Sequence, residues 1–345
     1  MQTQKRKLPD GILDAVGNTP LVQLSRYLDQ SRVRLYAKLE AFQPGGSAKA
    51  RPALAMIQSA LESGQIRPGS TVIESSSGNM GIGLAQTCRR FGLRFICVVD
   101  PNAQQQNVDI MRALGAEIDR VTEPVHGNFL SARLARVCYL LENTNNSFWP
   151  NQYANLDNPL AHQRGTIREI DGALGDDLDY LFVATSSTGT IRGCQDYLRQ
   201  LGRSTTVVAV DAVGSVLFGG NPGPRSIPGL GAGRLPPLAR DCDVKVVQRV
   251  TDLDCVVGCR RMAQREAVLV GGSAGGVLES VRRMQSLLQG KTCVAILHDS
   301  GTRYLDTVFN DDWVQTELGR SPRQIAELVQ NGSDPSRCYG QCGAA

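Results

Sequence analysis

The strongest constraint on the fold is an alternation of two hydrophobic patterns along the chain. Short runs of apolar, mostly β-branched residues are each followed by about 10 to 15 residues with helical periodicity. Because such an alternation builds βαβ units, it predicts parallel sheets covered by helices on both faces. The predicted strands are 35–39, 71–74, 95–99, 118–121, 181–184, 207–210 and 294–297, and the predicted helices are 52–63, 80–90, 104–114, 128–141, 190–201, 253–266 and 275–288.

Length and charge narrow the class of protein. A chain of 345 residues is long enough for about two domains. The net charge is only +4 and the basic residues are scattered, so no Lys/Arg run suits nucleic acid or an acidic membrane surface. No apolar run approaches the roughly 20 residues of a membrane helix, and residues 1–10 lack the apolar core of a signal peptide. We therefore expect a cytoplasmic protein that acts on small molecules, with no nucleic acid and no membrane as partner.

The cysteines and histidines do not form a recognisable metal site. Cys255 and Cys259 are one helical turn apart, and Cys338 and Cys342 lie near the C-terminus, but neither pair has a second such pair or a close histidine. We therefore predict no metal, and the role of the two tail cysteines is left open. The cysteines that lie in apolar runs and are expected in the core are Cys97, Cys138 and Cys293.

Residues 44–51, Pro-Gly-Gly-Ser-Ala-Lys-Ala-Arg, connect the first of these strands to the first helix. The two glycines permit a sharp turn, and Ser47 suits the N-cap of the helix. Lys49 would then lie at the helix start, where the macrodipole and the nearby Arg51 disfavour its protonated form. A partly neutral lysine is a nucleophile, and the chemistry that requires one is Schiff-base formation. By local spacing alone, a solvated lysine on a first turn is the stronger alternative.

Further turns of unusual composition open other predicted helices. Residues 75–81, Ser-Ser-Ser-Gly-Asn-Met-Gly, offer hydroxyls, free N–H groups and an amide to a carboxylate. Residues 185–190, Thr-Ser-Ser-Thr-Gly-Thr, suit a phosphate, although they contain neither a Walker lysine nor GxGxxG. Residues 271–276 carry only small side chains, which lets a ligand approach closely. Each could be a plain polar or flexible turn. Taken with Lys49 they match pyridoxal phosphate, which uses a Schiff-base lysine, a phosphate cradle and a partner for its ring nitrogen.

In this order, the motifs resemble those of the fold-type II pyridoxal-phosphate enzymes of the cysteine synthase and cystathionine β-synthase group. The resemblance runs from residues 16–21, Val-Gly-Asn-Thr-Pro-Leu, to residues 298–305, His-Asp-Ser-Gly-Thr-Arg-Tyr-Leu. It implies an α/β fold of the tryptophan synthase β type, with two doubly wound parallel-sheet domains, and a homodimer. The implied divisions are a larger cofactor domain of residues 1–43 and 152–320, a smaller mobile substrate domain of residues 44–151, and a C-terminal helix and tail of residues 321–345.

The resemblance also implies roles for individual residues. Lys49 corresponds to the internal-aldimine lysine and the base for the α-proton, Asn79 to the contact of the ring hydroxyl, and Ser273 to the partner of the pyridine nitrogen. A serine at this nitrogen leaves the ring largely unprotonated, which favours prompt β-elimination to a bound α-aminoacrylate. Gly229–Gly233 matches the loop that faces the substrate opening. The implied phosphate loop is Ser186, Ser187, Thr188, Gly189 and Thr190, and the implied carboxylate contacts are Ser76, Ser77 and Gln152.

Finer details resemble the branch that makes N-(2-amino-2-carboxyethyl)-L-glutamate from O-phospho-L-serine and L-glutamate. These details are residues 75–79, Ser-Ser-Ser-Gly-Asn, Tyr153 after Gln152, and Ser186. The chain also departs from the usual sulfhydrylases, which carry threonine in place of Met80 and a phosphate loop richer in glycine. The product of that branch leads to 2,3-diaminopropionate, a precursor of siderophores and peptide antibiotics. Tyr153 and Ser186 would bind the carboxylates of the second amino acid.

Phosphoserine as the donor places a demand on the site. Its leaving group carries close to two negative charges, so a cation is required nearby. Arg133, in the predicted helix 128–141, is our candidate, and a solvated helix arginine is the alternative. The base that deprotonates the acceptor amine is not identified, since none of His126, His162 and His298 is an obvious choice.

Other functions stay open at this point. A cysteine synthase using O-acetylserine or O-phosphoserine with sulfide shares every motif. A nicotinamide dehydrogenase would need GxGxxG after the first strand, where this chain has Pro-Gly-Gly-Ser-Ala-Lys. A catalytically silent binding protein on the same fold would have no reason to keep Lys49, Asn79 and Ser273 together.

Overall fold

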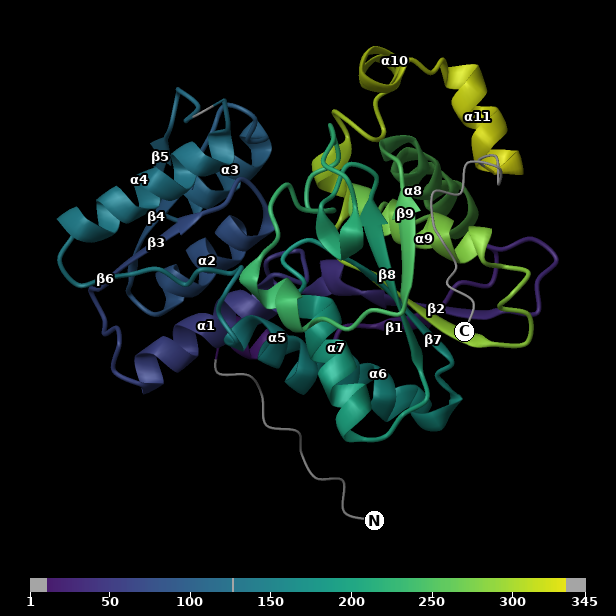
Figure 1. Cartoon of the computed structure of the whole chain (residues 1–345), viewed down its shortest axis with the longest axis horizontal. Helices are drawn as coiled ribbons and strands as arrows, with labels where there is room; N and C mark the ends of the chain where they lie inside the picture. Colours follow the sequence, from purple (N-terminus) through teal and green to yellow (C-terminus); the bar gives the residue numbers. More distant parts are fainter. Residues whose placement is uncertain (1–10, 126, 333–345) are drawn as a thin grey trace.

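The computed structural model describes residues 11–125 and 127–332, and it contains two sheets side by side (Figure 1). The larger sheet has the strand order β1-β2-β10-β7-β8-β9, and the smaller has the order β5-β4-β3-β6. All pairings are parallel except that of β1 with β2. The strands are β1 (Leu21–Gln23), β2 (Arg34–Leu39), β3 (Thr71–Ser75), β4 (Arg94–Val99), β5 (Glu117–Arg120), β6 (Ser147–Phe148), β7 (Tyr180–Ala184), β8 (Thr206–Ala212), β9 (Val246–Val250) and β10 (Thr292–Leu297).

The smaller sheet is covered on both faces because its strands are apolar on both. Along β4, Phe95 and Cys97 belong to one core with side chains of three helices, whereas Ile96 and Val98 belong to another with Val137. Successive side chains of a strand point to opposite faces, so a continuous apolar run needs cover on each side. The three helices are α1 (Ala50–Glu62), α2 (Asn79–Arg90) and α3 (Gln105–Ala113), and the helix on the other face is α4 (Phe129–Asn143).

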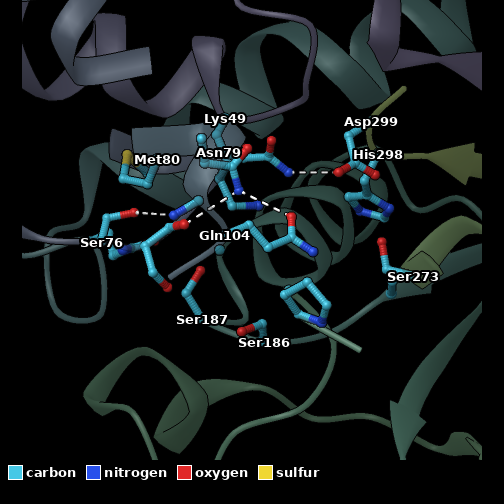
Figure 2. A pocket seen from close by; sticks show the side chains of 18 of the residues that line it. Lys49, Ser76, Asn79, Met80, Gln104, Ser186, Ser187, Ser273, His298 and Asp299 are labelled. Carbon is cyan, nitrogen blue, oxygen red and sulfur yellow. Dashed lines mark hydrogen bonds between the residues drawn. The ribbon is translucent and has the colours of Figure 1, made fainter. Parts of the chain in front are cut away.

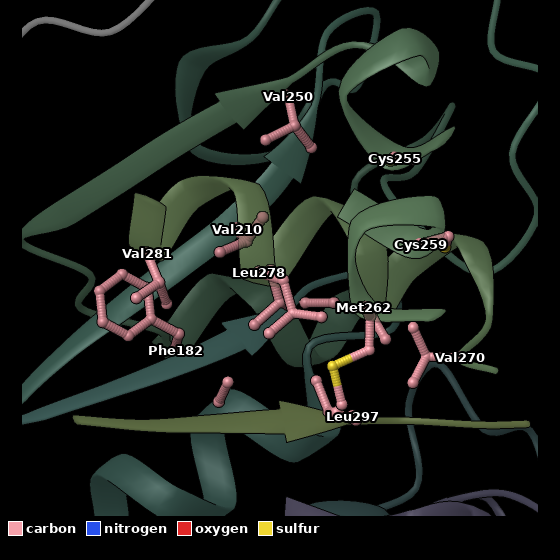
Figure 3. Close-up of a cluster of buried hydrophobic side chains, with 14 of the residues drawn as sticks. Phe182, Val210, Val250, Cys255, Cys259, Met262, Val270, Leu278, Val281 and Leu297 are labelled. Carbon is pink, nitrogen blue, oxygen red and sulfur yellow. The ribbon is translucent and has the colours of Figure 1, made fainter. Parts of the chain in front are cut away.

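The larger sheet follows the same rule. Phe182 and Val210 point into the core that Figure 3 shows beneath two helices, together with Leu278 and Met262. Neighbouring strand residues point the other way, into a core with Ile167 and other helical side chains. The covering helices are α8 (Asp252–Glu266) and α9 (Gly272–Arg283) on the first face, and α6 (Ile167–Leu174) and α7 (Gly189–Gln200) on the second.

All predicted strands and helices are present, with boundaries shifted by a few residues. The largest shift is in α9, which starts at Gly272 and ends at Arg283 instead of spanning 275–288. The sequence patterns did not predict β1, β6 or β9. They also did not predict the helices α5 (Asp157–Ala161) and α6, or the π-helix (His162–Thr166) between them. The helix expected from about residue 321 is confirmed as α11 (Pro322–Asn331), whereas α10 (Asp311–Leu318) was not predicted.

Some detailed predictions are corrected. Cys97 and Cys293 are buried as expected, but Cys138 is exposed, because it lies on the solvent side of α4. Ser47 does not cap α1: the N-cap position is Lys49, and the Ser47 hydroxyl accepts from the Lys49 N–H at 3.3 Å. His126, Cys338 and Cys342 lie outside the described residues.

The domain boundaries near residues 44 and 151 and the homodimer stay predictions.

In the described part of the chain, no helix has both the length and the apolar character that a membrane span requires.

Candidate active site

Between the two sheets lies a cavity of about 190 Å³, where turns at the carboxyl ends of β3, β7 and β10 converge. Such crevices are the usual ligand sites of open α/β sheets. In Figure 2, Lys49 and Asn79 lie on one side of this pocket and Ser186 and Ser187 on the other. The predicted site residues that line the pocket are Lys49, Ser76, Ser77, Asn79, Arg133, Gln152, Tyr153, Ser186, Ser187, Thr188, Gly189, Thr190 and Ser273. The predicted loop Gly229–Gly233 contributes Gly229 to this lining.

The electrostatics of Lys49 differ from the prediction in their cause. Loss of solvent around its amine lowers the pKa of Lys49, and the charges of Asp299 and Glu40 partly oppose that shift. Arg51 does not contribute as expected, because its guanidinium is neutralised by carboxylates: Nε lies 2.8 Å from Glu40 and Nη1 lies 2.6 Å from Glu169. The pocket therefore favours the neutral, nucleophilic amine through desolvation rather than through charge repulsion.

The serine-rich turn after β3 is ordered by its own hydroxyls. Ser76 Oγ accepts from the Gly81 N–H at 2.9 Å and more weakly from the Gly78 N–H at 3.4 Å. Because a hydroxyl that accepts still has its proton, Ser76 remains able to donate to a carboxylate. Gln152 is brought to the same pocket by its backbone N–H, which donates to Glu74 at 3.2 Å.

The turn after β7 has the features of a phosphate cradle. Thr188 adopts a left-handed conformation (φ +66°), and α7 begins at Gly189. A Cβ at Gly189 would overlap the Asn158 side chain, so only glycine permits this close approach. The Thr190 hydroxyl contacts His162 Nε2 at 3.2 Å, and burial lowers the pKa of His162 well below its usual value, which keeps the imidazole neutral. Free N–H groups at a helix start and several hydroxyls together suit a phosphate.

Arg133 is not the solvated arginine of the alternative interpretation. Its side chain is 15% exposed, and Nε lies 3.0 Å from the buried carboxylate of Asp100. Tyr153 lies close enough for the charge of Arg133 to act on it, but burial dominates and raises the pKa of Tyr153. The pocket thus contains a guanidinium whose charge is shared with one carboxylate.

Several pocket residues were not recognised from the sequence. They include the amide side chains of Asn102, Gln104 and Asn107, and the segment after β10. In that segment His298 is a poor candidate for the missing base, because burial and then Lys49 lower its pKa to about 3. The sequence did contain a signal for this segment, because residues 298–305 mark the end of the family resemblance. Only the order of strands in the sheet, however, shows that the segment lies beside Lys49. The pocket residues of this segment are His298, Asp299, Arg303 and Tyr304.

Comparison with known proteins decides the family. The family model described as pyridoxal-phosphate dependent enzyme matches residues 12–299. The chain belongs to this family. A curated relative from Ralstonia nicotianae, named N-(2-amino-2-carboxyethyl)-L-glutamate synthase, is 44% identical over 305 residues, which are 88% of this chain and 90% of the relative.

Solved structures of family members have the same fold. An O-acetylserine-dependent cystathionine β-synthase from Helicobacter pylori has a TM-score of 0.81 at 30% identity, with 88% of this chain and 99% of that chain covered. An O-ureido-L-serine synthase has a TM-score of 0.79 at 28% identity, with 91% and 100% covered. The α/β fold of type II, pyridoxal phosphate as cofactor and an enzyme of the β-replacement type are thereby established for this family member.

The residues of the pocket fit this cofactor. Lys49 would hold its aldehyde, the turn Ser186–Thr190 its phosphate, and Ser273 its ring nitrogen. When bound, pyridoxal phosphate withdraws electrons from the α-carbon of an attached amino acid. The separate role of each residue stays a prediction.

Proposed function

We propose that this enzyme joins O-phospho-L-serine and L-glutamate to form N-(2-amino-2-carboxyethyl)-L-glutamate and phosphate, in a route to 2,3-diaminopropionate. The observation that carries the proposal is the shielded guanidinium of Arg133 in the pocket wall. A phosphate leaving group needs such a cation, whereas a neutral acetyl ester does not. The 44% identity to the Ralstonia nicotianae synthase supports the same function.

The donor amino acid would be bound at its carboxylate and at its phosphate. Ser76 and Ser77, with Gln152, supply donors for the carboxylate on the side of β3. Arg133 reaches the pocket from α4 on the smaller sheet, so the phosphate would lie against that sheet. Asp100 keeps the guanidinium in place and lowers the cost of its burial when no phosphate is present.

Lys49 Nζ would act as the base that takes the α-proton of the donor. Burial lowers the pKa of Lys49, which favours the unprotonated amine that this role requires. Loss of the phosphate group would then leave the β-carbon of the donor open to attack by the amine of the second amino acid. Tyr153 and Ser186 line the same pocket and would bind the carboxylates of glutamate, which selects a dicarboxylate over a small nucleophile.

The second candidate is a cysteine synthase that uses O-acetylserine or O-phosphoserine with sulfide. The solved cystathionine β-synthase from Helicobacter pylori supports only the donor of this candidate, because its name specifies O-acetylserine. Sulfide is small and would need neither Tyr153 nor Ser186, so the two candidates differ in the use of these side chains.

A competition experiment tests the proposal. The purified enzyme is incubated with O-phosphoserine while glutamate and sulfide are offered together at equal concentration, and the products are identified by mass spectrometry. We expect the glutamate adduct to predominate, and we expect O-acetylserine to be a much poorer donor. Cysteine as the main product would establish the second candidate instead. A Lys49→Ala variant controls for uncatalysed addition.

A further inference from the structure

The segment after β10 is packed tightly between two turns of the site. Its backbone pairs with the Lys49 turn, where the Ala48 N–H donates to His298 O at 2.8 Å. A Cβ at Gly46 (φ +70°) would overlap the guanidinium of Arg303, and one at Gly271 would overlap the carboxylate of Asp299. Glycines at both positions therefore let this segment approach the turns on either side.

The amide of Asn79 is held at both ends by this segment. Nδ2 donates to Asp299 Oδ2 at 2.8 Å (Figure 2), and Oδ1 accepts from Arg303 Nη1. A carboxylate only accepts and a guanidinium only donates. Rotating the amide by half a turn would break both bonds and place donor against donor and acceptor against acceptor. Burial raises the pKa of Asp299, but the guanidinium of Arg303 cannot accept in any case, so the Asn79 amide is left with a single orientation.

Each of the two partners has a further contact that holds it in position. The Tyr304 hydroxyl donates to the same Asp299 oxygen at 2.7 Å. Arg303 Nη2 donates to the carbonyl of Gly45 at 2.7 Å, so one planar guanidinium connects the turn before Lys49 to the start of α2. The separation between Asn79 and the lysine turn is thereby set by a rigid group from the short 3-10 helix (Gly301–Tyr304) that follows β10.

We propose that Asp299 and Arg303 are positioning residues for the cofactor and that they act through Asn79. The family resemblance assigns Asn79 to the ring hydroxyl of pyridoxal phosphate. With one amide N–H engaged by Asp299, one N–H is left to donate into the pocket. A fixed donor at the ring oxygen stabilises its ionised form and so sets the electron distribution of the bound cofactor. The proposal rests on the cofactor of the family and not on the choice of acceptor.

Two substitutions test the orientation of the amide. Asp299→Asn replaces a pure acceptor with a group that can present either end, and Arg303→Lys keeps the charge but cannot reach Gly45 and Asn79 together. For each we expect a changed ratio of the absorbance bands of the bound cofactor and about tenfold faster loss of cofactor on dialysis, as for one charge-assisted hydrogen bond. Matched controls are Asp311→Asn and Arg323→Lys, whose side chains form surface ion pairs with Arg260 and Glu327.

A double-mutant cycle separates this role from general support of the fold. In an Asn79→Ala background we expect Asp299→Asn to change the band ratio and cofactor loss by less than about twofold, because its target is gone. An undiminished effect of Asp299→Asn in that background would overturn the proposal. It would also be overturned if Asn79→Ala shifts the absorbance bands while Asp299→Asn and Arg303→Lys, each alone, leave them unchanged. Should Asp299→Asn fail to fold, Arg303→Lys with Asn79→Ala decides. The ratio of glutamate adduct to cysteine is expected to stay constant, which keeps this test independent of the proposed function.

Discussion

At the scale of single residues, Lys49 and Lys38 show how far the surroundings of two lysines can differ. Lys38 Nζ lies 2.7 Å from Glu169 and donates to the Thr19 carbonyl at 2.6 Å, whereas Lys49 lines the pocket with a lowered pKa. Borohydride reduction of the holoenzyme should therefore leave a pyridoxyl adduct on Lys49 and none on Lys38, as read by peptide mass mapping. An adduct elsewhere would contradict the assignment. Lys49→Ala should lose both the adduct and the visible absorbance.

Arg133 is the residue on which the proposed choice of donor rests. Arg133→Ala should raise the KM for O-phosphoserine by about tenfold or more, the loss of a charge-assisted contact, with a much smaller change for glutamate. Steady-state kinetics with each substrate varied in turn measure this. The matched control is Arg136→Ala on the same helix. Arg136 forms an ion pair with Asp119, with 2.8 Å between Nη2 and Oδ2, and it does not line the pocket. An unchanged KM for O-phosphoserine would remove Arg133 from this role.

At the scale of elements, α8 and α9 pack so closely that there is no room for a Cβ at the glycines between them. A Cβ at Gly258 would overlap the carbonyl of Gly275, and Met262 of α8 and Leu278 of α9 belong to the same core (Figure 3). Since α9 carries Ser273 at its start, this packing also places the expected partner of the ring nitrogen.

Gly258→Ala should therefore be destabilising. We expect a loss of about 2 to 3 kcal/mol in the free energy of unfolding, typical of overpacking against a rigid neighbour. Gly172→Ala in α6 is the control, because a Cβ there meets nothing within 4 Å and alanine is the better helix former, with a gain of about 0.5 to 1 kcal/mol. Urea denaturation midpoints at constant slope measure both. Equal stability of the two variants would refute the close contact.

At the scale of the whole molecule, one ion-pair network connects elements far apart in the chain. Glu169 on α6 binds Arg51 on α1 and Lys38 on β2, and Arg51 also binds Glu40 at the end of β2. Burial would raise the pKa of Glu169, but the hydrogen bonds and charge of Arg51 outweigh it and lower the pKa to about 2.

This network predicts a pH dependence of stability. A carboxyl with a folded-state pKa below its unfolded value stabilises the fold above the unfolded pKa, and that contribution is lost as the pH falls from 4.5 to about 2. We expect Glu169→Gln to lower the free energy of unfolding at pH 7 by about 1 to 2 kcal/mol, a figure that allows for partial solvent screening. Because this variant has no carboxyl to protonate at position 169, its stability should fall less than that of the wild type between pH 4.5 and about 2. Thermal midpoints across the pH range measure it. Glu327→Gln, in an exposed pair with Arg323, should leave the curve unchanged.

Much of the pocket could be predicted because its residues lie in local motifs. The turns at residues 44–51, 75–81 and 185–190 are each recognisable by glycines and hydroxyl side chains between a predicted strand and a predicted helix. β1 and β6, by contrast, contain three and two residues, too few for any periodic pattern. The Ser47 cap was predicted wrongly because a good capping residue two positions early looks the same in sequence as one at the cap.

The sequence by itself determined the alternation of strands and helices, and with it the edge of the sheets where the motif turns had to gather. The tertiary structure alone decided which groups face one another there: Asp299 and Arg303 against Asn79, Asp100 against Arg133, and Glu169 against Arg51. The physical reason is one of range. Periodicity and turn chemistry act over a few neighbouring residues, whereas pKa values, ion pairs and amide orientation depend on groups that only the packing of the two sheets brings together.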